Sequence, residues 1–302
     1  MKLSTILIFV FFSFNTMAQD PLLWKIYHSE GTPTDYEKMM KTLAEADVIF
    51  LGEEHNNALA HWLQMQVVSD LYNIAKSDLM IGMEMFEADN QMVLNEYLTG
   101  LIPIDKFESD VRLWNNYKTD YKPIIEFSKK NNIPVIATNI PRRYASRVNK
   151  EGGLESLSKL SEQAKAFIAP LPIKFDDKFY ISLFADMMGH NAAMSKDTAK
   201  AGHNEVSPQL LYMSQSQAIK DATMAYFILK NQKKGTKFVH LNGNLHSDNF
   251  MGIPAYLKDK NNKLNVVIIT TVSVDKPEIF QESNKGQATF LFYVNSKAPK
   301  SY

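Results

Sequence analysis

Two short motifs of the form Gly-x-x-His carry the side chains best suited to chemistry in this sequence. Gly52-Glu53-Glu54-His55 and Gly243-Asn244-Leu245-His246 each follow a run of apolar residues. A neutral imidazole can bind a metal ion or act as a base, and a nearby carboxylate can bind the metal, hold the ring or activate water. Taken alone, each motif is typical of a solvated loop. Their repetition after two apolar runs indicates a shared site.

Glu84 is a third candidate because it lies in an almost wholly apolar segment. Residues 79–86 read Leu-Met-Ile-Gly-Met-Glu-Met-Phe. A buried carboxylate there is strongly unfavourable unless it is paired, hydrogen-bonded or bound to a metal. Two interpretations stay open: an ion pair with Arg142 or Arg143 that joins two strands, or a functional carboxylate.

Two histidines and one or two carboxylates form a ligand set suited to zinc, manganese, cobalt or iron. The absence of cysteine excludes thiolate metal sites, iron–sulfur clusters and cysteine nucleophiles. Of the neighbouring histidines, His61 is expected at a helix end or on the surface, and His240 in the interior with its hydrogen bonds satisfied.

Strand-length apolar runs alternate with helical patterns along the chain. Strands are expected at residues 47–51, 79–86, 133–138, 237–241, 264–272 and 288–294, the last an edge strand that could run antiparallel. This alternation predicts an α/β fold with a mainly parallel central sheet flanked by helices. Residues 150–232 show only helical patterns and are expected to form a helical insertion between the third and fourth strands. Because ligands bind beyond the carboxyl ends of parallel strands, the candidate side chains should meet at one rim.

The composition and the first residues favour an exported protein. The 302 residues contain 33 basic and 33 acidic side chains, so nothing favours nucleic acid as a partner. Lys2, the apolar run 3–14 and the small residues that follow predict a signal peptide at 1–19. That run is too short to span a bilayer, and no cysteine follows it to carry a lipid. We expect residues 20–302 to form one periplasmic or extracellular domain with no transmembrane segment.

Six groups of residues, taken in order, resemble the ChaN-like haem-binding uptake proteins of the Tiki superfamily. They are residues 52–57, 82–86, Trp114 with 121–124, 139–142, Gln217 with 221–225, and 243–246 with 252–254. The resemblance covers about residues 47–257. It implies an exported protein that binds haem in iron acquisition, pairs as a homodimer around haem and ligates the iron through a tyrosine. The partner in an uptake complex is not identified.

Within this resemblance, Tyr144 is the predicted iron ligand, with Arg143 beside it. A phenolate can hold ferric haem, and arginines favour both the phenolate and the haem propionates. Tyr117, Tyr121, Tyr180 and Tyr212 are the alternatives. A further expectation is a methionine-rich cover over the haem, and the alternative is that the methionines pack in an ordinary helix core. The residues concerned are Met187, Met188, His190, Met194, His203 and Met213.

The resemblance also implies a second function, because Tiki-type relatives are metal-dependent peptidases and a distant branch hydrolyses macrolide lactones. Those peptidases share two Gly-x-x-His motifs, a glutamate and an arginine, which correspond here to the two motifs above, Glu84 and Arg142. In this alternative the chain is a peptidase or esterase in which His55, His246 and Glu84 hold the metal and Glu53 activates water. The candidate catalytic residues are then Glu53, Glu84 and Arg142. A relative without either activity, acting as an interaction module, is the third possibility.

Overall fold

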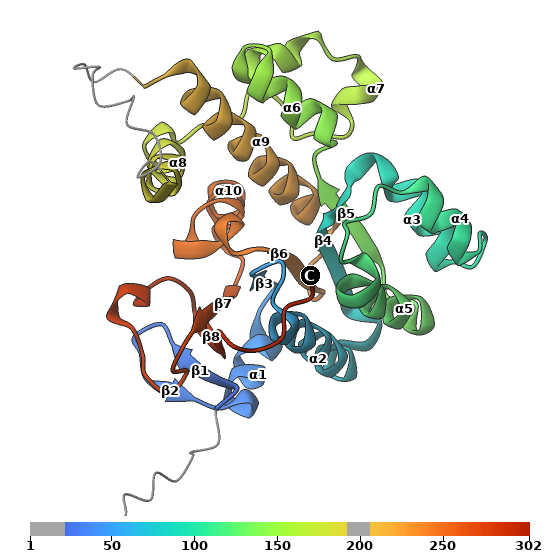
Figure 1. The fold of residues 1–302 in the computed structure, drawn as a ribbon. Coiled ribbons are helices and arrows are strands. Elements are labelled where there is room, and N and C mark those ends of the chain that lie inside the picture. Colours follow the sequence, from blue (N-terminus) through green and yellow to red (C-terminus); the bar gives the residue numbers. More distant parts are fainter. Residues whose placement is uncertain (1–21, 192–205) are drawn as a thin grey trace, which may run out of the picture.

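An eight-stranded sheet runs through the computed structural model, which describes residues 22–191 and 206–302 (Figure 1). Its order is β2-β1-β8-β7-β3-β6-β4-β5, and the six strands from β8 to β5 are parallel. The strands are β1 (Trp24–His28), β2 (Pro33–Thr34), β3 (Val48–Glu53), β4 (Leu79–Glu87), β5 (Val135–Asn139), β6 (Lys237–Gly243), β7 (Val266–Val274) and β8 (Phe290–Asn295). The predicted signal peptide and the side chains of Met187, Met188, His190, Met194 and His203 lie outside the described part.

Helices cover both faces of the sheet, as predicted for an α/β fold (Figure 1). One face packs against α1 (Tyr36–Glu45), α2 (Ala58–Ala75), α3 (Gln91–Leu98), α4 (Ile104–Asp110) and α5 (Lys122–Asn131). The other packs against α9 (Pro208–Asn231) and α10 (Ile253–Lys260). Within the described residues, no helix is long and apolar enough to cross a membrane.

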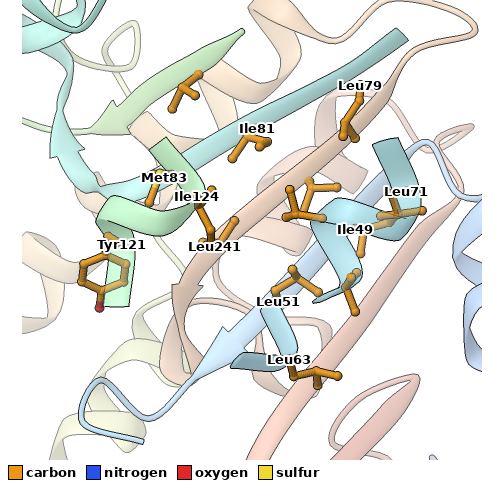
Figure 2. Packing of buried hydrophobic residues seen from close by; sticks show 14 of the residues in the cluster. Ile49, Leu51, Leu63, Leu71, Leu79, Ile81, Met83, Tyr121, Ile124 and Leu241 are labelled. Atoms are coloured by element: carbon orange, nitrogen blue, oxygen red, sulfur yellow. The ribbon is translucent and has the colours of Figure 1, made fainter. Parts of the chain in front are cut away.

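Strand β3 shows why these apolar runs form central strands. Ile49 and Leu51 point to the face covered by α2, where they pack with Leu63, and Val48 and Phe50 point to the face covered by α9. Figure 2 shows the first of these layers, with Leu241 of β6 among the side chains. Burying one such side chain contributes about 1.5–3 kcal/mol. A strand buried on both faces therefore needs a continuous apolar sequence.

The region between β5 and β6 is helical in its described part, as expected for the insertion. It contains α6 (Arg142–Lys150), α7 (Glu162–Lys165), α8 (Asp177–Asn191) and α9. Ser207 caps α9 by accepting a hydrogen bond from the backbone N–H of Leu210, and Pro208 opens the helix. The helix α9 then passes over the sheet from the insertion, which places its polar residues near the strand ends (Figure 1).

The main difference from the predicted fold concerns the last strand, which was expected at residues 288–294 on an edge of the sheet. Strand β8 is parallel to β7 and lies inside the sheet, because residues 275–289 return along the sheet without forming a crossover helix. Strand β1, which the sequence pattern did not predict, pairs with β8 in antiparallel fashion, and the two-residue β2 follows outside it. All six residues of β8 are buried as a result.

The strand order brings the predicted motifs together. Strand β6 lies between β3 and β4, with β5 beyond β4. All four strands run in the same direction, so their carboxyl ends at Glu53, Gly243, Glu87 and Asn139 share one rim of the sheet.

Candidate functional site

Glu84 lies buried at the centre of the site, and each of its carboxylate oxygens faces a donor. Oε1 lies 3.2 Å from Nε2 of His246, and Oε2 accepts a hydrogen bond of 2.8 Å from the backbone N–H of Gly243. The partner of this carboxylate is therefore a histidine and a strand end, and the interpretation as an ion pair with Arg142 or Arg143 is wrong. Burial raises the pKa of Glu84, but His246 and His55 outweigh it and hold that pKa well below its usual range.

His246 is clamped between two carboxylates. Its Nδ1 is hydrogen-bonded to Oδ1 of Asp221, on α9, while its Nε2 faces Glu84. Burial lowers the pKa of His246, but Glu84 and Asp221 outweigh it and raise that pKa to about 10. The ring is therefore an imidazolium at neutral pH. Asp221 also accepts a hydrogen bond of 2.8 Å from the hydroxyl of Tyr180, on α8.

His55 lies on the other side of Glu84 and is held by a carboxylate of its own. Its Nδ1 lies 2.9 Å from Oε1 of Glu53. Glu53 is buried and also accepts hydrogen bonds from the Tyr121 hydroxyl and the Gln64 amide, each of 2.6 Å. This hydrogen bond can hold the orientation of the His55 ring, which is one of the roles expected of Glu53. Burial lowers the pKa of His55, but Glu53 and Glu84 outweigh it, so that pKa is raised.

Gly243 allows the His55 ring to lie close to the strand end. A methyl group at this position would lie 2.8 Å from Cε1 of His55. On its other side, the ring meets the edge of Trp114, with ring centres 4.9 Å apart and planes at 88°. The glycine of the second motif thus provides the space for the histidine of the first.

His61 lies in the first turn of α2, as expected for a histidine at a helix end, but it is buried and not on the surface. Its Nε2 lies 3.0 Å from the carbonyl oxygen of His55 and 3.3 Å from Oδ2 of Asp120. It therefore supports the loop that carries His55. His240 is buried as predicted, and its ring nitrogens are hydrogen-bonded to the side chains of Thr138 and Asn242.

Arg142 lies at the rim but does not touch the histidines. Its side chain is 64% exposed, and its Nε lies 3.9 Å from Oε1 of Glu87. Together with Glu84, Trp114 and Lys220 it lines a cavity of about 130 Å³. His55, Glu84 and His246 thus converge as predicted, whereas Arg142 shares only the lining of this cavity with Glu84.

The prediction of a divalent metal at His55, His246 and Glu84 finds no support. In residues 22–191 and 206–302, no group of three His, Cys, Asp or Glu side chains has an arrangement that could hold a metal ion. In the described part of the chain, the two ring nitrogens of His246 lie against carboxylates, Nδ1 against Asp221 and Nε2 against Glu84.

The tyrosines predicted as possible haem ligands differ in how deeply they are buried. Tyr117, Tyr121 and Tyr180 are buried, and burial raises the pKa of each. Tyr144 is half-buried in the first turn of α6, with the guanidinium carbon of Arg143 4.5 Å from its ring centre. Arg143 also pairs with Asp89.

Asp221, which the sequence places only within the groups that resemble the ChaN-like proteins, and Gln64, which no sequence pattern indicates, also take part in the site. The segment Ala218 to Ala225 also contains Lys220 and Thr223, so Asp221 does not stand alone in an apolar run as Glu84 does. Gln64 lies on the buried face of α2 and donates to both Glu53 and the carbonyl of Leu51. No spacing in the sequence distinguishes it from an exposed glutamine.

The fold and the sequence are both similar to known proteins. ChaN of Campylobacter jejuni, whose structure is described as cofacial haem binding, shares 17% identity, with a TM-score of 0.68 over 90% of this chain and 97% of that chain. A succinoglycan biosynthesis protein shares 13% identity, with a TM-score of 0.51 over 91% of this chain and 95% of that one. A search of the curated proteins finds no match. The sequence model for haem-binding uptake proteins of the Tiki superfamily, ChaN, matches residues 39–257. That match spans more than half of the sequence, and this chain belongs to the ChaN family of haem-binding uptake proteins.

Proposed function

We propose that this chain is an exported protein that binds haem for iron acquisition. The observation that carries the proposal is the match of the haem-binding uptake family over residues 39–257. The fold shared with ChaN of Campylobacter jejuni over 90% of the chain supports it. The hydrolase alternative lacks comparable support, since the two histidines and Glu84 do not form a metal site in the described residues.

Tyr144 and Arg143 fit the requirements of a ferric haem site. One guanidinium nitrogen of Arg143 lies 3.4 Å from the Tyr144 hydroxyl. A tyrosine binds ferric iron as the phenolate, and the Arg143 guanidinium lies within reach of that oxygen. Arg143 is also exposed enough to meet a haem propionate, with 53% of its side chain accessible. Bound haem would supply the iron, and this chain would contribute the phenolate ligand and a positive charge for the propionates.

The competing buried tyrosines fit a haem less well. The Tyr121 hydroxyl donates to Glu53 and the Tyr180 hydroxyl to Asp221, so each is held as a neutral phenol beside a carboxylate. Binding iron at either position would break a buried hydrogen bond to a carboxylate. This favours Tyr144 over both of them.

A haemin titration tests the proposal. Purified protein should give a saturable, shifted Soret band, and Tyr144→Phe should weaken binding at least about tenfold because the anionic ligand is lost. Tyr72→Phe is the matched control, since Tyr72 is a half-buried tyrosine that packs on Phe127 near the far end of α2. No saturable change with the wild-type protein would refute haem binding. Equal binding by the wild-type protein and Tyr144→Phe would refute only the choice of ligand.

Export and dimerisation belong to the same proposal and have separate tests. The charged start, apolar run and small residues at 1–19 support export. Expression of the full chain in a Gram-negative host should yield a periplasmic protein whose N-terminus, by mass spectrometry, begins near residue 20. An uncleaved chain in the cytoplasm would contradict export. Sedimentation velocity with and without haemin should show a dimer in the loaded sample, and a monomer there would contradict pairing around haem.

A further inference from the structure

A second hollow, larger than the cavity at Glu84, lies between the helical insertion and α10. It has a volume of about 430 Å³. Residues 169–174 form one wall, α9 forms the floor and the carboxyl half of α10 forms the opposite wall. This volume falls in the range of small-molecule sites, about 300–1,000 Å³. Neither the haem proposal nor the histidine cluster uses it.

Small residues in the floor create this hollow. Ala222 and Ala225 lie three apart on α9 and are both buried, while Tyr226 and Leu229 continue the same stripe. Methyl side chains leave open the space that larger apolar residues would fill on such a face. Leu171, which is 36% exposed, lies in the wall formed by residues 169–174. The interior of the pocket is therefore largely apolar and reachable from solvent.

The charged side chains of the pocket lie at one end and carry a net positive charge. Lys174 lies 3.1 Å from Oδ1 of Asp259, and Lys260 lies 3.4 Å from Oδ2. Two ammonium groups and one carboxylate leave one positive charge. Tyr256 donates a hydrogen bond of 2.6 Å to the carbonyl oxygen of Lys174 and so fixes the backbone at this end.

We propose that this pocket binds a small amphipathic carboxylate, with its apolar body over Ala222 and Ala225 and its carboxylate at Lys174 and Lys260. Apolar walls with a few polar groups at one end are the usual design of a site that orients such a ligand. The net positive charge selects an anion, because a cationic amphiphile would meet two ammonium groups. The inference does not depend on haem binding.

Calorimetric titration of the full protein with dodecanoate, below its micellar range, tests this assignment. We expect saturable binding of one molecule per chain. Ala225→Leu should weaken binding at least about tenfold by filling the floor. Leu171→Asp, at a partly exposed position, should weaken it by placing a charge in the apolar wall of the pocket. Lys174→Ala should weaken binding about threefold, as expected for one exposed ion pair, and the loss should shrink at high salt.

Lys150→Ala is the matched control for the lysine variant, because Lys150 is an exposed lysine on α6 outside the pocket. It should bind dodecanoate like the wild-type protein. No saturable binding below about 1 mM would overturn the assignment. Equally tight binding of dodecyltrimethylammonium would overturn the choice of an anion. Stoichiometric displacement of dodecanoate by haemin would show that haem occupies the pocket, and would likewise overturn it.

Discussion

Glu84 remains charged in an apolar strand because His246, His55 and the backbone N–H of Gly243 stabilise its charge. Its two oxygens face an imidazolium and a backbone N–H. We predict that Glu84→Gln lowers the free energy of unfolding by about 3–5 kcal/mol, the cost of removing one partner of a buried ion pair. Denaturant unfolding measures this. Glu87→Gln, three residues further along the same strand at the rim, should cost less than about 1 kcal/mol. Equal losses for the two variants would contradict the central role of Glu84.

Because the pKa of His246 is raised, the stability gained from its contact with Glu84 depends on pH. A histidine with a pKa of about 10 in the folded protein and an ordinary value of 6.5 stabilises the fold fully below pH 6.5. That contribution is lost as the pH rises towards 10. The stability difference between the wild-type protein and Glu84→Gln should therefore shrink over this range, as measured by unfolding at a series of pH values. A constant difference would show that His246 is not an imidazolium.

Gly243 has a steric role that a single methyl group tests. Gly243→Ala would place its Cβ against the His55 ring, which must then move away from Glu53. We predict a loss of about 1–3 kcal/mol, as for overpacking elsewhere, and altered NMR signals of the His55 ring. The control is Ala255→Gly on α10, which changes the backbone away from His55. Gly235→Ala would not serve, because Gly235 has a positive φ. Unchanged His55 signals in Gly243→Ala would contradict the close packing.

At the scale of elements, a hydrogen bond from Tyr180 joins α8 to the site. The Tyr180 hydroxyl donates to Asp221, which holds His246. Tyr180→Phe should lower the free energy of unfolding by about 1–3 kcal/mol and speed hydrogen exchange in the first turns of α8. Tyr97→Phe removes a comparable hydroxyl–carboxylate bond in α3, and should leave exchange in α8 unchanged. Slow exchange in α8 of Tyr180→Phe would show that packing alone holds the helix.

The elements that the sequence predicts are those whose pattern is local. Strands β3, β4 and β6 have continuous apolar runs because both faces are buried, so their positions can be recognised without knowing their neighbours. Strand β1 reads Trp-Lys-Ile-Tyr-His and is stabilised by pairing with β8, 266 residues away at Ile26 and Phe292. Such distant pairing leaves no signal within a short window. The direction of β8 depends likewise on the path of the preceding segment.

At the scale of the whole molecule, the layer between the sheet and α2 belongs to an extensive buried apolar cluster. Leu241 is fully buried in it, while Leu245, four residues further on, is 41% exposed. We predict that Leu241→Ala costs about 2–5 kcal/mol through lost burial and a residual cavity. Leu245→Ala should stay within about 0.5 kcal/mol of the wild-type protein in the same denaturant experiment. Similar losses would mean that the layer repacks around the smaller side chain.

The convergence of the site follows from topology that the sequence pattern already contains. Polar residues after parallel strands must share one rim, which is why His55, Glu84 and His246 meet as predicted. Their chemical state does not follow from spacing. Whether His246 is a neutral ligand or an imidazolium depends on Asp221, which arrives on a helix from the insertion and meets the ring only in three dimensions.

The position of β6 has a consequence for how the chain is made. It lies between β3 and β4, which precede it by more than 140 residues, and its last residue supplies the N–H group that Glu84 requires. A ribosome therefore completes β4 long before its carboxylate can find either partner. Until residue 246 is available, this apolar segment carries an unpaired charge and an open sheet edge, features that make a folding intermediate prone to aggregation.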